Sequence, residues 1–447
     1  MTRLEMIWKD RIAARLAPGF FLRNVSTVAA GTILAQGIAI AAAPILTRMF
    51  TPGDFGVQAI FISLVDIFVI VLTLQYDMAI ILPSEDQQAK QLAGLALRLA
   101  GKLLIWSLPV AFLFLIIPGL NLPFWKNIPP YVVVMALVSA FVLAVKKVLN
   151  YWNIRQKSFL VIAIALISGA LLAAIFKISA GYFMARPGVL ITGVLLSHCI
   201  NILFQVKLGR NEGLLKEGLA AITAENRYQE VFREYSDFPK FRLPQSLLNV
   251  FGKNIPVILL ISLLGPAVGG FYALANRVVN LPGILISESI KKVFYQKASE
   301  FHVKGTGLFR LILKTTLGLA VVGLIPFGAL IIFSPWLFGI VFGPEWRMAG
   351  IYASYLAIWM YVVFCNTPVL AAIPVLRRQR RYLFFNLGIL VIISSAVIVG
   401  TRTGQPLKAV MYLAAAGTLC DLALILDVHA QARRIENSRC GKGGYDR

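Results

Sequence analysis

Twelve stretches of about 20 mostly apolar residues run through this chain, and each is long enough to cross a lipid bilayer as a helix. Only 14% of the residues are charged, where soluble domains carry about 25%, and 58% are hydrophobic. A soluble nucleic-acid-binding protein would need a wetted basic surface, for which this composition leaves little room. The sequence therefore predicts an all-α polytopic membrane protein with twelve transmembrane helices and no nucleic-acid partner. The predicted spans are approximately 25–46, 56–76, 97–117, 130–149, 159–178, 188–206, 243–264, 267–288, 311–333, 349–373, 382–399 and 407–427.

Basic residues are distributed very unevenly between the two sides of the predicted membrane. The formal net charge is +23, and 33 of the 43 Lys and Arg residues lie in the terminal segments and in the loops after every second helix. The loops on the other side hold 7 of them. Loops rich in Lys and Arg stay in the cytoplasm, so both termini are predicted to be cytoplasmic. Most of the net charge therefore encodes orientation in the membrane.

The first residues show no apolar core directly after the first charges, as a cleavable signal peptide would. Leu4, Trp8, Ile12 and Leu16 recur every four residues, with Arg and Lys between them. This spacing predicts that 1–24 forms an amphipathic helix on the cytoplasmic leaflet. A frayed terminal tail is the alternative interpretation.

Signatures of enzymes and cofactor sites are missing from the sequence. There is no phosphate-binding glycine loop, no Ser/His/Asp set with recognisable spacing, and no His or Cys pair at the spacing of metal ligands. Cys199, Cys365 and Cys420 lie inside predicted spans, which argues against a disulfide framework. The polar segments are too short for a catalytic domain or an ATPase. We therefore predict that the protein is not an enzyme and needs no cofactor or metal.

The longest polar stretch separates six predicted helices from the other six. Shifting the sequence by 214 residues aligns Pro52 with Pro266 and Gly56 with Gly270, in the turns that join the first two helices of each half. An even number of helices per copy gives a parallel repeat about an axis along the membrane normal, as in several transporter folds. The predicted organisation is an N-terminal segment, a six-helix bundle, a cytoplasmic linker, a second six-helix bundle and a tail, at 1–24, 25–206, 207–242, 243–427 and 428–447.

The linker carries mixed charges at a spacing of three to four residues, which favours a short helix on the cytoplasmic surface. A solvated connector between the two halves is one interpretation, and a docking surface for cytoplasmic partners is the other.

Two basic residues lie deep inside the first two predicted helices of the second half. Lys253 and Arg277 are at similar depth, and Asn254 and Asn276 are beside them. Ionisable residues inside a membrane are costly and commonly functional. Two cations with polar neighbours could bind a pyrophosphate, so we predict a pyrophosphate-binding site. The alternative is that the two cations pair with Asp66 or Asp421 and only hold helices together.

Three further ionisable residues in predicted spans are candidates for coupling transport to an ion gradient: Asp66, His198 and Asp421. Asp66 could bind the coupling ion, or it could be the counter-ion of a basic residue. His198 is a weaker candidate, because a buried histidine is more often a hydrogen-bonded interior residue than a proton relay. Asp421, late in the last predicted span, is also a weaker candidate.

Three stretches of the chain resemble Wzx-type polysaccharide flippases. They are NVSTVAAGTILAQ with PILTRMFTPGDFGVQAIF in 24–61, QYDMAIILP at 75–83, and DFPKFRLPQSLLNVFGKNIPVILL with GPAVGGFYALANRVVNLP in 237–282. This family belongs to the MOP superfamily, which also includes MATE drug exporters and the lipid II flippase. The resemblance places Arg48, Pro52, Asp54 and Gly56 in a periplasmic turn, and Tyr76 and Asp77 in a cytoplasmic one.

The resemblance implies a MATE-like, V-shaped pair of bundles that works by alternating access. It implies translocation of an undecaprenyl-pyrophosphate-linked glycan across a bacterial inner membrane, with ion coupling. Membrane lipids, a polysaccharide polymerase and a chain-length regulator would be its partners. Two other functions stay open, a MATE-like antiporter of drugs or small molecules and a non-transporting scaffold of a polysaccharide assembly complex.

Overall fold

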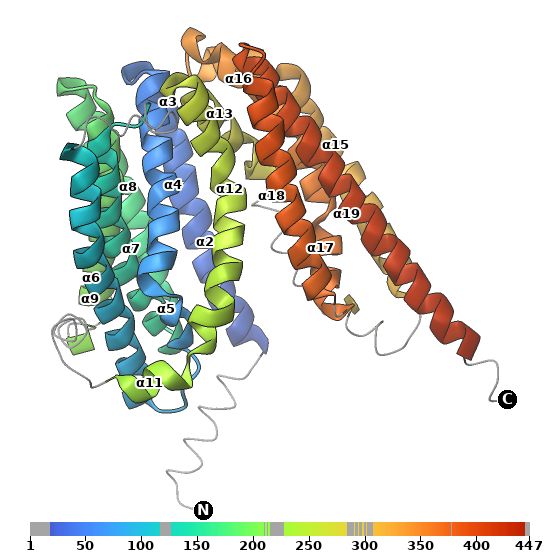
Figure 1. Cartoon of the computed structure of the whole chain (residues 1–447), viewed down its shortest axis with the longest axis horizontal. Coiled ribbons are helices and arrows are strands. Elements are labelled where there is room, and N and C mark those ends of the chain that lie inside the picture. Colours follow the sequence, from blue (N-terminus) through green and yellow to red (C-terminus); the bar gives the residue numbers. More distant parts are fainter. Residues whose placement is uncertain are drawn as a thin grey trace, which may run out of the picture. The chain divides into compact units, whose positions relative to one another are not determined.

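The structure is a computed structural model in which every described regular element is a helix (Figure 1). The described residues are 18–116, 127–209, 228–283, 307–376 and 378–442, with the single positions 211, 213, 214, 290, 294, 297, 298 and 301. Residues 1–17 of the amphipathic helix predicted over 1–24, the middle of the predicted linker and the last five residues of the tail lie outside this description, and 18–24 belong to the first helix, α2 (Pro18–Ala41).

Eleven helices of the described chain are long and apolar enough to cross a membrane. They correspond to eleven of the twelve predicted spans, and they confirm an all-α polytopic membrane protein. The remaining span was predicted at 267–288. Helix α13 (Pro266–Val279) occupies the first part of it, and 284–289 lie outside the described residues.

The described chain divides into two compact units. Unit 1 holds 18–50, 61–116 and Pro129–Leu247, and unit 2 holds Thr51–Ile60, Asn127, Ile128 and the residues from Leu248 onward. The helix α4 (Pro52–Thr73) therefore contributes its first turns to unit 2 and the rest to unit 1.

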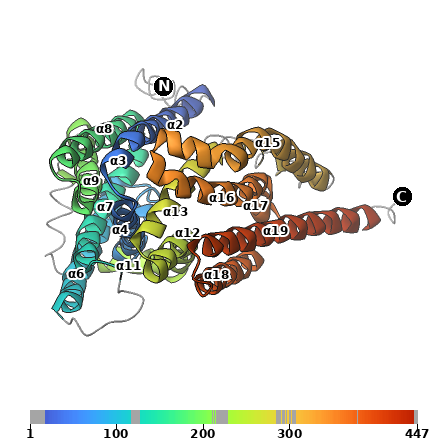
Figure 2. The same cartoon turned by 90° about the horizontal axis from the view of Figure 1, so that it is seen from above.

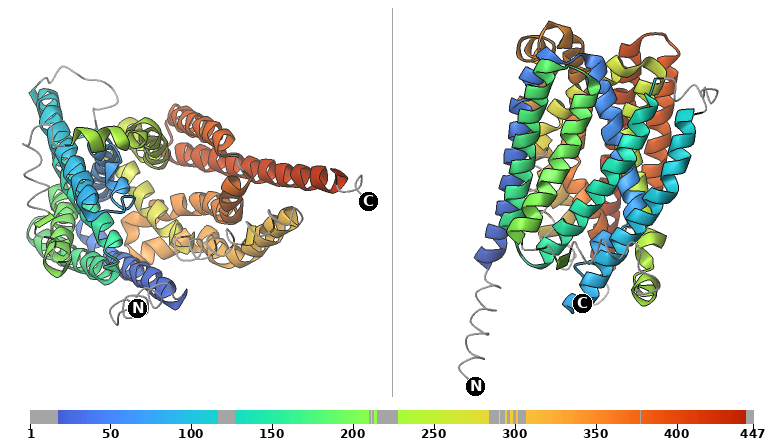
Figure 3. Two further views of the ribbon diagram at one scale, coloured as in Figure 1. Left: turned by 90° about the horizontal axis from the view of Figure 1, so that it is seen from below. Right: turned by 90° about the vertical axis from the view of Figure 1, so that its left-hand side faces the viewer.

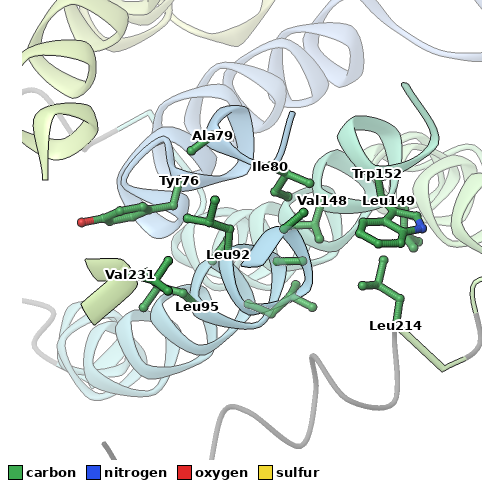
Figure 4. Close-up of a cluster of buried hydrophobic side chains, with 14 of the residues drawn as sticks. Tyr76, Ala79, Ile80, Leu92, Leu95, Val148, Leu149, Trp152, Leu214 and Val231 are labelled. Atoms are coloured by element: carbon green, nitrogen blue, oxygen red, sulfur yellow. The ribbon is translucent and has the colours of Figure 1, made fainter. Parts of the chain in front are cut away.

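Unit 1 is a helical bundle with its main buried cluster at one end. Helix α8 packs against α2 and α9, and α7 packs against α6 and α9 (Figure 3, right). Tyr76, Leu92, Leu149 and Trp152 belong to the buried cluster, where the turn after α4 meets α6 and α7 (Figure 4). The helices are α2 (Pro18–Ala41), α3 (Ala43–Met49), α4, α5 (Tyr76–Ala79), α6 (Asp86–Ile116), α7 (Pro130–Arg155), α8 (Phe159–Phe183), α9 (Pro187–Gly209), α11 (Gln229–Glu234) and a short π-helix (Phe238–Arg242).

Unit 2 is organised around α16, which packs against α13, α15 and α19. Helix α18 lies along α19 (Figure 2). A buried cluster that includes Ile312, Val369 and Leu424 joins α15, α17 and α19. The helices of this part of the chain are α12 (Leu243–Leu264), α13, α15 (Leu308–Val341), α16 (Arg347–Cys365), α17 (Thr367–Val375), α18 (Gln379–Thr401) and α19 (Pro406–Lys442).

Two helices run well past the ends of their predicted spans. Helix α7 continues to Arg155, whose guanidinium Nε donates a hydrogen bond to Asp86 Oδ1 at 2.9 Å. Helix α19 continues through most of the predicted tail, and the carboxylate of Glu436 accepts hydrogen bonds from the backbone N–H groups of Gly307 and Phe309. These N–H groups lie at the start of α15, where a helix has no internal acceptors. Polar contacts thus extend both helices beyond their apolar segments.

Candidate functional site

The turn between α3 and α4 is held by local polar contacts. Pro52 begins α4, where proline is favoured because its missing N–H would have no acceptor. The backbone N–H and the hydroxyl of Thr51 donate to Asp54 Oδ2 at 2.9 and 2.7 Å, and the Asp54 N–H donates back to the Thr51 hydroxyl at 3.3 Å. This is a reciprocal cap of a helix start. Arg48 donates to the carbonyl oxygen of Pro44 at 2.9 Å, so Arg48 and Asp54 stabilise the turn itself.

The two copies of the repeated turn contact each other within unit 2. A Cβ atom added to Gly56 would overlap the carbonyl group of Pro266, and one added to Gly270 would overlap the carbonyl group of Pro52. We call these four residues the glycine clasp. Only glycine allows such a close approach of two backbones. The four residues are the ones that the shift of 214 aligns, so the sequence repeat corresponds to a reciprocal contact in space.

Aromatic rings cover the clasp within unit 2. The ring of Trp346, which is fully buried, contacts Phe55 and Phe271 edge to face, at centroid distances of 4.9 and 5.9 Å. Phe55 precedes Gly56, and Phe271 follows Gly270. One tryptophan thus fixes both copies of the turn. Edge-to-face pairs of this kind add about 0.5–1.5 kcal/mol each beyond the area they bury.

The chain turns sharply after α4, at the end of unit 1 that the charge distribution predicts to be cytoplasmic. Leu74 and Gln75 both have positive φ angles, 45° and 64°, a conformation that is costly for residues other than glycine. The side chain of Gln75 accepts a hydrogen bond from the Ser246 hydroxyl at 3.0 Å, and the Tyr76 hydroxyl donates to the carbonyl oxygen of Phe232 at 3.0 Å. Burial raises the pKa of Tyr76 to about 12, so this hydroxyl keeps its proton at physiological pH.

Asp77 in the same turn is a completely buried carboxylate. Lys147 Nζ on α7 lies 3.6 Å from Asp77 Oδ2, and neither oxygen of Asp77 accepts a hydrogen bond. A buried charge of this kind is stable only while its partner is present. Tyr76 and Asp77 begin the short helix α5 directly after the sharp turn, and the structure gives the partner of each.

The predicted pyrophosphate site falls on α12 and α13. The side chains of Lys253 and Arg277 are exposed on these helices. The two amides are engaged locally. Asn254 donates to the carbonyl oxygen of Val250 at 3.0 Å, and the side-chain oxygen of Asn276 accepts from Asn280 at 2.9 Å. The amides therefore stabilise their own helices, and the pyrophosphate-binding role of the two cations stays a prediction.

The predicted coupling candidates of the first half lie on α4 and α9. Asp66 is half-buried on α4. His198 on α9 is also half-buried, its Nδ1 has no hydrogen-bond partner, and the charges of Lys146 and Lys177 act on it. The structure thus places His198 in a basic environment inside unit 1.

Asp421, the third coupling candidate, is held by neutral donors in unit 2. Its Oδ2 accepts a hydrogen bond from the indole Nε1 of Trp359 at 2.8 Å, and its Oδ1 accepts from Asn366 Nδ2 at 2.9 Å. Within the described chain no Lys or Arg forms an ion pair with it. The alternative that Asp421 neutralises Lys253 or Arg277 is therefore not what the structure shows.

The sequence analysis did not single out Lys146 and Lys147, because it counted both with the basic residues of the cytoplasmic side although they lie inside the span predicted at 130–149. Helix α7 continues to Arg155, nine residues beyond Lys146, which is about 14 Å of helix. Lys146 is half-buried and has no ion pair within the described residues. The apolar residues on both sides of the two lysines were the available signal. Among the described residues, no group of His, Cys, Asp or Glu could hold a metal ion.

A family model described as "Polysaccharide biosynthesis protein" matches residues 45–350. The chain belongs to this polysaccharide biosynthesis family. The match spans the turn between α3 and α4, the glycine clasp and the predicted pyrophosphate site. No curated protein matches the chain.

Several solved structures share the fold. The lipid II flippase MurJ gives a TM-score of 0.63 at 10% identity, covering 92% of this chain and 89% of the other. A multidrug resistance MATE family transporter of the MOP superfamily gives 0.60 at 14% identity, with coverages of 92% and 96%. A MATE transporter from Vibrio cholerae gives 0.56 at 12% identity, with coverages of 92% and 96%. The family match confirms the predicted polysaccharide biosynthesis protein, and these structures show that its fold is the one shared by MATE transporters and the lipid II flippase.

Proposed function

We propose that this protein moves a polyprenyl-pyrophosphate-linked oligosaccharide from the cytoplasmic to the periplasmic leaflet of a bacterial inner membrane. The observation that carries the proposal is the basic chemistry of its membrane-spanning helices. Within unit 2, Lys253 is exposed on α12 and Arg277 on α13, and Arg277 forms no ion pair within the described chain. Cations inside predicted membrane spans are costly unless they serve a function.

A pyrophosphate matches these cations in charge and in hydrogen bonding. It offers several anionic oxygens, to which a guanidinium can donate two parallel hydrogen bonds. A cationic drug would be repelled by the same side chains, which favours a lipid pyrophosphate over the drug-antiporter alternative. The family match supports a role in polysaccharide assembly.

The proposed mechanism is alternating access. The anionic head group binds the basic side chains while the polyprenyl tail stays in the bilayer. An ion gradient drives the cycle through one of the carboxylates in the spans. Both termini are cytoplasmic in this proposal, and a polymerase with a chain-length regulator receives the product in the periplasm.

The scaffold alternative depended on neutralisation of the central cations by Asp66 and Asp421. Asp421 instead accepts hydrogen bonds from two neutral side chains, which removes one half of that support.

The deciding experiment is complementation of a bacterial strain that lacks its own flippase. Arg277→Ala and Lys253→Ala should lose surface polysaccharide at normal expression, because each removes a cation that binds the pyrophosphate. Lys314→Ala is the matched control, since Lys314 is exposed on α15 near the predicted cytoplasmic surface, and it should retain surface polysaccharide. Full activity of both Lys253→Ala and Arg277→Ala would contradict the pyrophosphate site.

A further inference from the structure

Asp421 lies at a break between two helices that the sequence predicted as one span, 349–373. Helix α16 ends at Cys365 and α17 begins at Thr367. Pro368 has no N–H to donate to the carbonyl group of Phe364, so the helical hydrogen bond is lost there. The hydroxyl of Thr367 donates to this carbonyl oxygen instead, at 2.7 Å. Asn366, whose side chain donates to Asp421, is the residue between the two helices. Its N–H donates to the carbonyl oxygen of Val362 at 2.9 Å and its own carbonyl oxygen accepts from Leu370 at 3.0 Å, so the break consists of the hydrogen bond missing at Pro368.

Asn366 has an unused acceptor beside the carboxylate. The residue is completely buried, its Nδ2 donates to Asp421, and its Oδ1 has no hydrogen-bond partner. Buried polar atoms are rarely left unpaired, because an unpaired one costs about 1–3 kcal/mol. A carboxylate and a carbonyl oxygen side by side are also the ligand types that bind small hard cations. The pair lacks a positively charged group.

The indole on the other side of Asp421 is fixed in place by a glycine. A Cβ atom added to Gly417 would overlap the ring of Trp359, so the ring lies directly on the backbone of α19, one turn before Asp421. This contact orients the indole N–H toward Asp421 Oδ2, at 2.8 Å. Trp359 is thus an intrinsic fluorescent reporter of the state of the carboxylate.

The groups around Asp421 supply no positive charge. Tyr382 on α18 and the adjacent Cys420 are the ionisable groups on which its charge acts, and both are neutral at physiological pH. On α16, Tyr361 and Cys365 interact with each other. Among the described residues, no charged side chain of α15 or α17 forms an ion pair with it. A carboxylate inside a membrane span with only neutral neighbours has a strong tendency to take up a cation.

We propose that Asp421 and Asn366 form the cation-binding site that couples transport to an ion gradient, and that the bound cation changes the break between α16 and α17. This inference rests on the proposed transport function and assigns its coupling step to unit 2. A proton on Asp421 turns one carboxylate oxygen into a hydroxyl donor. Once the amide of Asn366 rotates, this hydroxyl can donate a hydrogen bond to Asn366 Oδ1. A sodium ion would bind the two oxygens directly. Either cation replaces the present Asn366–Asp421 hydrogen bond.

Titration of the purified protein in detergent tests the site directly. Tryptophan emission is measured from pH 5 to 9 at constant salt, and separately against NaCl with choline chloride holding the ionic strength. A saturable change is expected in one titration, and the titration that shows it identifies the cation. The change should disappear in Trp359→Phe and in Asp421→Asn. Asp427→Asn is the matched control on the same helix, because Asp427 pairs with Arg381 outside the break, and it should keep the change.

Asn366→Ala is a second test of the site, in case Asp421→Asn does not fold. It leaves the carboxylate and removes both the donor and the unused oxygen, so the titration midpoint should shift by about tenfold in cation concentration, as expected for one hydrogen bond to a charged group. The proposal is overturned if neither titration changes the emission of the wild type, or if the change persists in folded Asp421→Asn.

Complementation distinguishes this inference from the transport function. In a flippase-deficient strain, the surface polysaccharide restored by the wild type should depend on the gradient of the cation found by titration. The amount restored by Asp421→Asn should be lower by about tenfold or more. If the wild type itself restores no polysaccharide, the transport proposal fails while the titration still decides the cation site. Asp421→Asn activity equal to wild type, with the same dependence on the gradient, would overturn the coupling role.

Discussion

Asp77 in unit 1 is completely buried and Asp421 in unit 2 is half-buried, and the two carboxylates are stabilised by opposite means. Asp77 has a lysine 3.6 Å away and no hydrogen-bond donor. Asp421 has two hydrogen-bond donors and no lysine or arginine partner in the described chain. A buried carboxylate that depends on one counter-ion destabilises the fold when that counter-ion is removed. A carboxylate held by neutral donors can be neutralised without leaving another buried charge uncompensated. The first arrangement suits a structural role and the second suits a group that changes its state.

The largest effect is expected at the ion pair. Lys147→Met leaves Asp77 buried without its counter-ion, which should lower the free energy of unfolding by about 3–5 kcal/mol. Thermal unfolding of the purified variant in detergent measures this. The double variant Asp77→Asn with Lys147→Met should recover most of the loss, because two neutral side chains need no counter-ion. A double variant as unstable as the single one would show that the pair is not the cause.

Gly417→Ala should have the next largest effect. The added methyl group overlaps the Trp359 ring and moves the indole away from Asp421, at a cost of about 1–3 kcal/mol for overpacking. Gly318→Ala is a matched control, because a Cβ atom there meets no neighbour within 4 Å. Thermal unfolding compares the two. Equal behaviour would mean that the ring adapts without loss.

Asp421→Asn should change stability far less than Lys147→Met. It removes a charge and leaves no other charge unpaired, so the expected loss is about 1 kcal/mol, from a weakened hydrogen bond. If it destabilised the protein as strongly as Lys147→Met, the two carboxylates would be equivalent and the comparison would fail.

Tyr76→Phe should have the smallest effect, a loss of about 1 kcal/mol for one hydrogen bond to the Phe232 carbonyl oxygen. Chemical unfolding against pH measures it. The pKa of Tyr76 is raised to about 12 in the folded protein. The unfolded tyrosine ionises near pH 10, so the wild type should lose stability above about pH 10 and the difference from Tyr76→Phe should shrink. A constant difference through pH 11 would contradict the burial of this hydroxyl.

Apolar periodicity predicted the spans well where the helix ends coincide with the ends of apolar stretches. The span predicted at 243–264 has the same bounds as α12. It failed where polar contacts set the helix end, as at Arg155 on α7 and Glu436 on α19. The span predicted at 349–373 is one candidate span in the structure. The hydrogen bond missing at Pro368 within it was not predicted, because membrane helices tolerate proline.

The candidate site was predictable in its residue types and less so in its contacts. A charge inside a span is visible in the sequence, so Asp421, Lys253 and Arg277 could be named. Their partners lie far along the chain, as Trp359 does from Asp421, and no local pattern connects them. For Asp77 the sequence predicted only that it lies in a turn. Its ion pair with Lys147 was not predicted, because Lys147 was counted with the following loop. The pyrophosphate site and the coupling residues stay predictions for the experiments above.

The glycine clasp also bears on how such a chain could have arisen. In a dimer with two-fold symmetry, the interface contacts are reciprocal: if residue i of one subunit contacts residue j of the other, then residue j of the first also contacts residue i of the second. Gly56 meets Pro266 and Gly270 meets Pro52 in this way, inside one polypeptide. The contact has the form of a homodimer interface retained after gene duplication and fusion of an ancestor half as long. Gly56 and Gly270 are separate positions in this chain, and each must remain glycine for the two turns to keep their contact.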